Sequence, residues 1–230
     1  MIQVIDEKSQ HLQEIIASWH YLGKHTYRKH VIAQQFVQEG NKFHGIYGEI
    51  MINAPLETVL EAFIGFGQVD EKSPLQVQKS TICQKFYFCS EEDKRRHDMV
   101  VNKQGPYESF YFVTHNVTRS PVALIVSHRD AVVFSVMRFV TQKKAYLYSI
   151  EYGYPKQMEG VVRVLFDTQL VELEEIEPNK VKINQYVLCN PKGMIPAWVM
   201  NAALDERNNV LLLLKGFCEG EIKPEYGIYK

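Results

Sequence analysis

The chain has 230 residues, of which 46% are hydrophobic and 12% aromatic, and its 26 basic and 27 acidic side chains leave a formal net charge of −1. This length suits one domain or two small ones and supports a sizeable core without a metal or a disulfide. The charge balance gives no electrostatic case for nucleic-acid binding, and no uncharged apolar stretch approaches the roughly 18 residues of a membrane-spanning helix.

The first third of the chain predicts a helix, two strands and a second helix. Apolar residues at helical spacing predict an amphipathic helix over residues 9–22, with Ser9 as its N-cap. Alternating apolar residues predict strands at 31–37 and 45–52. Asn53-Ala54-Pro55 then predicts the start of a short helix that ends at Gly65-Phe66-Gly67.

The next hundred residues are predicted to be mostly strand, and the chain ends in a long helix. Short turns separate the strands, which favours an antiparallel meander because parallel neighbours need long crossover connections. Gly193 to Pro196 opens a helix that is predicted to reach about Phe217, with Val199 and Ala202 facing inward. The order of elements indicates one α+β domain over residues 1–230. The predicted strands are 76–89, 98–101, 107–117, 130–141, 144–152, 160–176 and 180–190.

No familiar catalytic or metal-binding pattern is present. The four cysteines form no Cys-x-x-Cys pair, and the eight histidines form no His-Glu-x-x-His motif. We therefore expect free thiols, no metal, no cofactor and no catalytic residue. The first residues lack the basic start and apolar run of a signal peptide, so we expect a cytoplasmic protein. The cysteines are Cys83, Cys89, Cys189 and Cys218.

A short basic run, Asp93 to His97, is predicted to lie in a polar hairpin loop. Two interpretations stay open for it. It is a solvated turn, or it contacts anionic lipid headgroups.

The strand predicted at 130–141 is apolar on both faces, which indicates cover on both sides or an apolar cavity on one of them. Ser135 interrupts one of these faces, and Gln185 interrupts the apolar row of the strand at 180–190. A polar group in such a place needs a protein partner, a trapped water or a ligand headgroup. An internally paired Gln185 and a ligand-binding Gln185 both remain open.

Four segments, taken in order, resemble the START (StAR-related lipid transfer) domain. Gly48 to Leu60 is similar to its first strand-to-helix passage, and Ser127-His128-Arg129-Asp130 to its Pro-Arg-Asp strand opening. Ser149 to Val164 is similar to a strand, proline loop and Gly-x-x-Arg strand of that family. Asn190 to Asn201 resembles the signature that precedes the last helix. The resemblance is strongest over residues 40–217.

The resemblance implies a helix-grip fold, in which a curved antiparallel sheet of about nine strands wraps a long C-terminal helix and encloses an apolar tunnel. It also implies binding of one lipid, a sterol, phospholipid or similar molecule, and its transfer between membranes. We expect a monomer that makes transient contact with membrane surfaces and performs no catalysis. The loop from Gly153 to Gly160 would lie at the tunnel mouth. We expect the ligand to contact Tyr111, Val133, Ser135, Met137, Gln185, Val187, Val199, Ala202 and Ala203, and the mouth to carry Tyr152, Tyr154 and Met158.

Departures from the family pattern leave the headgroup open. Some members place a charged residue in the tunnel six positions after the Arg of the Arg-Asp pair, where this chain has Ser135. Arg129 and Asp130 are then candidates for a structural role. Two other function classes stay open: a helix-grip enzyme of the cyclase or aromatase type acting on an apolar substrate, and a non-catalytic protein-interaction scaffold.

Overall fold

The computed structural model describes residues 2–65, 81–118, 127–153, 159–202 and 204–221. Within these ranges the chain forms one curved sheet in the order β1-β2-β3-β10-β9-β7-β6-β5-β4, and every neighbouring pair along it is antiparallel. A short strand, β8, pairs in parallel with the start of β6. The strands are β1 His20–Tyr27, β2 Val31–Val37, β3 Gly45–Ile52, β4 Thr81–Phe88, β5 Phe110–Thr118, β6 His128–Thr141, β7 Lys144–Glu151, β8 Val161–Arg163, β9 Leu165–Glu177 and β10 Lys180–Asn190.

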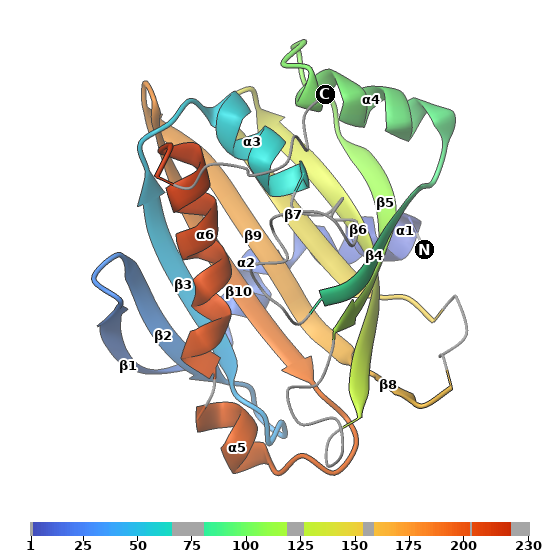
Figure 1. Cartoon of the computed structure of the whole chain (residues 1–230), viewed down its shortest axis with the longest axis vertical. Coiled ribbons are helices and arrows are strands. Elements are labelled where there is room, and N and C mark those ends of the chain that lie inside the picture. Colours follow the sequence, from blue (N-terminus) through green and yellow to red (C-terminus); the bar gives the residue numbers. More distant parts are fainter. Residues whose placement is uncertain (1, 66–80, 119–126, 154–158, 203, 222–230) are drawn as a thin grey trace.

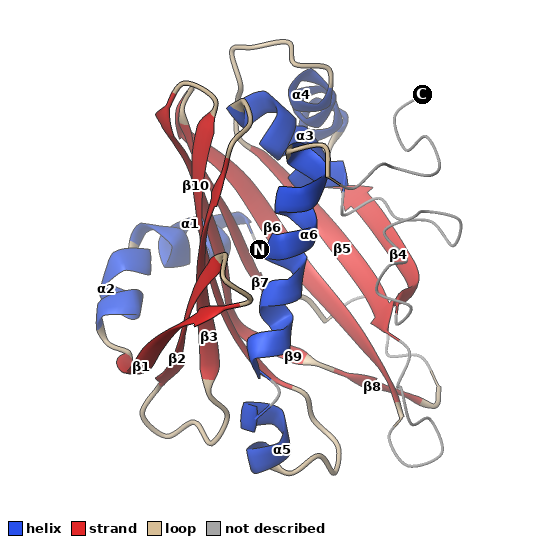
Figure 2. Ribbon diagram, turned by 60° about the vertical axis from the view of Figure 1, so that its left-hand side comes forward, coloured by secondary structure: helices blue, strands red, loops and turns tan. Residues whose placement is uncertain are grey.

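Helices lie on both faces of this sheet (Figures 1 and 2). The sheet curves around α6, which we call the concave side, and α3 contacts both α4 and α6 there. The first two helices lie on the opposite, convex face. This arrangement confirms the predicted α+β helix-grip architecture. The helices are α1 Ile2–Gln10, α2 Leu12–Ala17, α3 Leu56–Gly65, α4 Glu91–Val101, α5 Ala197–Ala202, the 3-10 helix η3 Leu204–Asn208 and α6 Asn209–Cys218.

Two clusters of buried side chains explain why β6 is apolar on both faces. On the concave face Met137 joins a core cluster with Leu211 and Leu214 of α6. On the convex face Val136 joins a second cluster with Ile5 of α1. Both alternating rows of the strand are therefore buried, as the sequence pattern indicates.

The N-terminal segment differs from its prediction. The helix predicted over 9–22 is two shorter helices, α1 and α2, and the chain turns into β1 at His20. Trp19 leaves the helical register because its ring stacks on Phe36, with 4.1 Å between ring centroids. Strand β1 is an edge strand with no buried residue, so its sequence lacks the alternation that reveals a half-buried strand.

The predicted strand at 98–101 and the predicted polar loop at 93–97 are both wrong, because these residues form α4. The side chain of Ser90 caps this helix by accepting a hydrogen bond from the backbone N–H of Asp93 at 3.0 Å. Acidic residues occupy the first turn, where their negative charge interacts favourably with the positive end of the helix dipole. Glu92 also forms ion pairs with Arg95 and Arg96. The basic run therefore lies on a helix stabilised by its own charges.

The predicted long C-terminal helix is also wrong in detail, because it is divided into α5, η3 and α6. A 3-10 helix turns about 120° per residue against about 100° in an α-helix. The five residues of η3 therefore rotate the following helix by about 100° relative to an unbroken one. A face extrapolated at 3.6 residues per turn does not continue across this break.

A buried ion pair fastens β8 to β6. The guanidinium of Arg163 donates two hydrogen bonds to the carboxylate of Asp130, at 2.9 and 2.7 Å, and the Asp130 side chain is inaccessible to solvent. Nε2 of His115 lies 3.2 Å from the same carboxylate. Asp130 has a structural role on the convex side of the sheet, one of the roles that its sequence motif left open.

We expect Gly45→Ala to destabilise the fold by about 1 to 3 kcal/mol, because overpacking a dense core forces strained side chains. Gly45 lies opposite Phe36, and a Cβ at Gly45 would lie 2.1 Å from the buried Phe36 ring. Gly23→Ala is the matched control, since nothing lies within 4 Å of a Cβ there. Urea unfolding measures both, and equal midpoints for the two variants would contradict the packing account.

We expect Arg163→Met to destabilise the protein by about 3 kcal/mol or more, because it leaves the Asp130 carboxylate buried without its bidentate partner. The double variant Arg163→Met, Asp130→Leu removes both charges and is expected to recover most of that loss. Chemical denaturation of the three proteins tests this. A double variant no more stable than the single one would show that the charge itself is not the cause.

Candidate functional site

The concave face of the sheet is the candidate site, because it presents apolar side chains to the covering helices. Directly paired residues on neighbouring strands point to the same side, so the register defines rows across the face. One row runs from Met137 through Leu147 and Val171 to Gln185 and Gly48. The apolar members of this row are buried in the same cluster as Leu211 of α6.

Five of the predicted ligand-contacting residues lie together on this face. Val133, Ser135 and Met137 alternate along β6 with the convex row, and all three are buried. Gln185 and Val187 lie on β10, two and four residues after the cluster member Ile183, and both are buried. The period-2 pattern of the two strands predicted this shared face, and contact of these residues with a ligand stays a prediction.

The next row of the face is polar at its centre. Ser135 pairs with Ser149 of β7, which pairs with Gln169 of β9. The two serine hydroxyls lie 2.8 Å apart and share a hydrogen bond in the interior. Gln169 lies diagonally beside Gln185, because Gln185 pairs with Val171.

Asn208, at the end of η3, extends these polar groups to the helical cover, and sequence reasoning missed it. Asn208 is 1% exposed, and its side-chain amide lies over Gly48, where a Cβ would be 2.2 Å from the Oδ1 atom of Asn208. Gly48 is the residue paired with Gln185. We call Ser135, Ser149, Gln169, Gln185 and Asn208 the polar stripe. Gly48 is required here because any side chain would displace the amide of Asn208.

Tyr111, predicted to contact the ligand, lies on the convex face instead. It pairs with Val136 rather than with Ser135, and its ring belongs to the convex cluster. Its hydroxyl donates to the carboxylate of Asp6 in α1 at 3.0 Å, and Arg138 also bonds that carboxylate. The tyrosine therefore helps to fasten α1 to the sheet, and burial together with Asp6 raises the pKa of its phenol.

Val199 and Ala202, predicted to face inward, do not line the concave face. No residue of α5 is buried, Val199 is 37% exposed and Ala202 is exposed. The break at η3 is the reason: the cover is supplied by Leu204 of η3 and by Leu211 and Leu214 of α6. Ala203 lies outside the described residues.

Of the three residues predicted at the tunnel mouth, the structure describes Tyr152. Its backbone N–H donates to the carbonyl of Val132 at 3.0 Å, and its ring lies 6.1 Å from that of Phe134 on the convex side. Tyr154 and Met158 lie outside the described residues.

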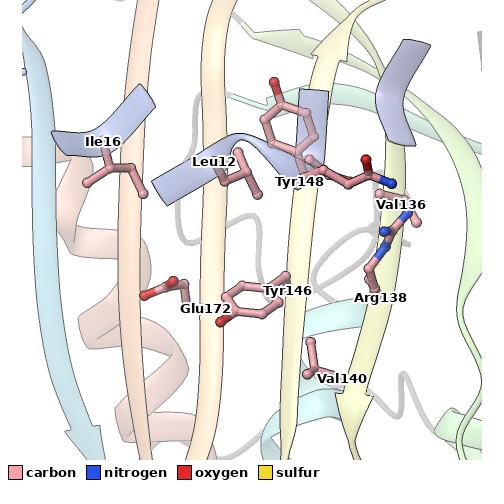
Figure 3. A pocket seen from close by; sticks show the side chains of 10 residues that line it. Leu12, Ile16, Val136, Arg138, Val140, Tyr146, Tyr148 and Glu172 are labelled. Carbon is pink, nitrogen blue, oxygen red and sulfur yellow. The ribbon is translucent and has the colours of Figure 1, made fainter. Parts of the chain in front are cut away.

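The convex face carries a small cavity between α1, α2 and strands β6, β7 and β9, with a volume of about 190 Å³. Figure 3 shows Leu12 and Ile16 on one side of it and Tyr146, Arg138 and Glu172 on the other. Two of its charged groups already have protein partners, since Arg138 bonds Asp6 and Glu172 accepts a hydrogen bond from Asn184 at 3.0 Å. The cavity is part of the docking surface of α1 and α2.

The described residues supply little metal or thiol chemistry. They contain no group of three or more His, Cys, Asp or Glu side chains placed to hold a metal ion. Cys89, Cys189 and Cys218 are free thiols, and burial raises the pKa of Cys218 to about 12. Within the same residues, no helix combines the length and apolarity needed to cross a membrane.

No protein-family model matches the chain, and no curated protein matches it. Several solved structures do. Human StAR-related lipid transfer protein 5 is 13% identical with a TM-score of 0.67, and the match covers 95% of each chain. Human STARD10 is 14% identical with a TM-score of 0.64, over 93% of this chain and 78% of that one. A STAR-related lipid transfer protein from Xanthomonas axonopodis is 14% identical with a TM-score of 0.65, over 88% and 99%.

These identities are low, and the likeness extends over nearly the whole chain. The described residues form one open sheet that is antiparallel except at β8, with a C-terminal helix across its concave side. This arrangement matches those structures over most of the chain. The chain has the fold of the StAR-related lipid transfer domains, as its four sequence motifs predicted.

Proposed function

We propose that the protein binds a single lipid against the concave face, beneath η3 and α6, and carries it between membranes without catalysing a reaction. The observation that carries this proposal is a face of apolar rows on which the buried Nδ2 atom of Asn208 has no partner among the described residues and lies close to Gln185, whose amide also bonds none. A closed core rarely leaves such groups unpaired. The structural neighbours named for lipid transfer support the same function.

Burial of acyl or sterol carbons supplies the affinity. Each methylene moved from water to an apolar environment contributes about 0.8 kcal/mol, so a ligand with ten or more buried methylenes would bind strongly by this effect alone. The polar stripe adds little affinity by comparison, but it orients the ligand and selects its headgroup. No step of this mechanism requires a nucleophile or a general base.

Membrane contact is proposed for the segment around α5. Met194 is 99% exposed and Trp198 is 74% exposed, so two large apolar side chains point into water beside the C-terminal cover. Lys192 precedes this segment in the chain. Lys42 lies beside it, since the Asn201 amide donates to the carbonyl of Lys42 at 3.4 Å. Aromatic and basic side chains together suit an interface with anionic headgroups.

The first prediction compares two tryptophan substitutions on opposite faces of β9. Gln169→Trp fills the concave face, and we expect it to abolish most lipid extraction from phosphatidylcholine vesicles carrying mixed minor lipids. Glu174→Trp places the same ring on the half-exposed convex side of the strand and is expected to extract lipid like the wild type. Sedimentation of the vesicles followed by mass spectrometry of the protein fraction measures the extracted lipid.

Near-ultraviolet circular dichroism is the control that both variants fold. Wild-type protein that extracts no lipid would refute the carrier proposal. A folded Gln169→Trp variant that extracts at the wild-type rate would instead show that the ligand lies elsewhere.

The second prediction uses the two tryptophans of the chain. Trp198 is exposed and Trp19 is buried, so we expect anionic vesicles to shift the tryptophan emission to the blue as Trp198 leaves water. Trp19→Phe should keep this shift, whereas Trp198→Phe should lose it. A shift that survives in Trp198→Phe, or none in the wild type, would exclude α5 as the membrane contact.

A further inference from the structure

The polar stripe crosses the concave face without a break. Ser135, Ser149 and Gln169 occupy one row of paired residues on β6, β7 and β9. Gln185 follows diagonally on β10, and Asn208 lies over Gly48, the partner of Gln185. Five polar side chains from separate elements thus meet on a largely apolar surface, where Thr114 and Asn116 of β5 are further polar residues.

The stripe has more hydrogen-bonding capacity than its own members use. The hydroxyls of Ser135 and Ser149 carry two protons, and their mutual hydrogen bond uses one of them. Nδ2 of Asn208 is buried and has no partner among the described residues, and its side chain does not cap α6. The residue Gln185 is 8% exposed, and its amide bonds no described side chain or backbone group, although it is not fully closed to solvent as Nδ2 of Asn208 is.

Protein interiors seldom leave buried amides unpaired, because a buried polar group without a partner destabilises the fold. Here the unpaired groups belong to different elements and lie side by side. That juxtaposition indicates a missing partner that touches several of them together. The partner must both accept and donate hydrogen bonds, because the open positions include N–H groups and the carbonyl oxygens of two glutamines.

Charged side chains are few around the stripe. Two positions along the strands from its members, the described residues are apolar, except for Glu151 and Asp167, whose side chains are exposed. The apolar residues are Val133, Met137, Leu147, Val171, Ile183 and Val187. Charged groups on this side lie toward one end, where Arg129 donates to the carbonyl of Lys192 and Arg207 interacts with the thiol of Cys189. A phosphate or carboxylate at the stripe would be buried without a counter-ion, which is strongly unfavourable.

We propose that the polar stripe binds the polar end of an uncharged lipid that carries a hydroxyl or amide group, such as a sterol, a diacylglycerol or a ceramide, and discriminates against phospholipids and fatty acids. The inference rests on the proposed lipid-carrier function and specifies its ligand class. Gln185 and Asn208 supply donors from opposite sides of the site, and the free proton of the serine pair supplies a third.

The first test is a competition. Wild-type protein is incubated with phosphatidylcholine vesicles that contain equal amounts of cholesterol, diacylglycerol, ceramide, phosphatidic acid and free fatty acid. Native mass spectrometry of the recovered protein then identifies the bound species. We expect an uncharged lipid at one molecule per chain. Recovery of phosphatidic acid, fatty acid or phosphatidylcholine as the main ligand would overturn the inference but leave the carrier function standing, whereas recovery of no lipid would overturn both.

The second test substitutes the amides. Gln185→Met and Asn208→Leu keep the approximate volume and remove the hydrogen-bonding groups. We expect each to weaken binding of the lipid found in the competition about five- to tenfold, as loss of one or two hydrogen bonds implies. Gln34→Met is the matched control, since Gln34 lies on the other face of the sheet, where its amide donates to the carbonyl of Leu22 at 2.7 Å.

Thermal unfolding of the lipid-free proteins separates a ligand-binding role from a structural one. Because the amides lack protein partners, we expect Gln185→Met and Asn208→Leu to leave the Tm unchanged or to raise it. A lower Tm together with wild-type lipid affinity would show that the stripe is structural. Unchanged affinity in both folded variants would also overturn the proposal.

Discussion

The pairing of β3 with β10 is the constraint on which the rest of the structure depends. Seven residues of each strand pair directly, from Val181 with Ile52 to Val187 with Ile46. This contact joins strands that lie some 130 residues apart in the chain and brings the start of the meander next to its end. It also determines which residues meet beneath the C-terminal helices, because Gly48 and Gln185 are paired by this register.

The same sheet is apolar on both faces, so the fold needs two covers with different properties. On the convex side, Asp6 accepts hydrogen bonds from Tyr111 and Arg138, and Ile5 packs against the sheet. Polar groups of the sheet and of α1 therefore pair with each other and hold this cover in place. On the concave side the helices contribute Leu211 and Leu214, but the amide groups beneath them remain without described partners. On the convex side the buried Nε1 of Trp19 also lacks a described partner, but it is an isolated group. On the concave side Asn208 and Gln185 lie close together, which is the arrangement expected of a candidate binding face.

Periodicity predicted the parts of this architecture that are buried in alternation. Strands β6 and β10, with Ser135 and Gln185 among their apolar residues, were placed correctly on one face. Periodicity did not predict the edge strand β1, because none of its residues is buried. It also did not predict α4, because charged pairs such as Glu92 with Arg96, and not an apolar stripe, stabilise that helix. Asn208 could not be found this way, since its burial depends on the absence of a side chain at Gly48, 160 residues earlier. The sequence places such a residue near the site only when the strand register is known.

The break in the C-terminal helix gives one short segment two separate tasks. An unbroken α-helix would turn α5 and α6 in phase, so a face that buried Leu211 would tend to bury residues of α5 as well. The 3-10 segment η3 adds about 100° of rotation about the helix axis relative to an unbroken α-helix. As a result α5 has no buried residue, whereas Leu204 and Asn208 of η3 are buried. Trp198 is thereby left in water, and Asn208 is brought over Gly48. A membrane contact and a headgroup contact would then lie at the two ends of one short, irregular helical segment. Binding of α5 to a bilayer could act on the cover of the site directly, because η3 is the connection between them.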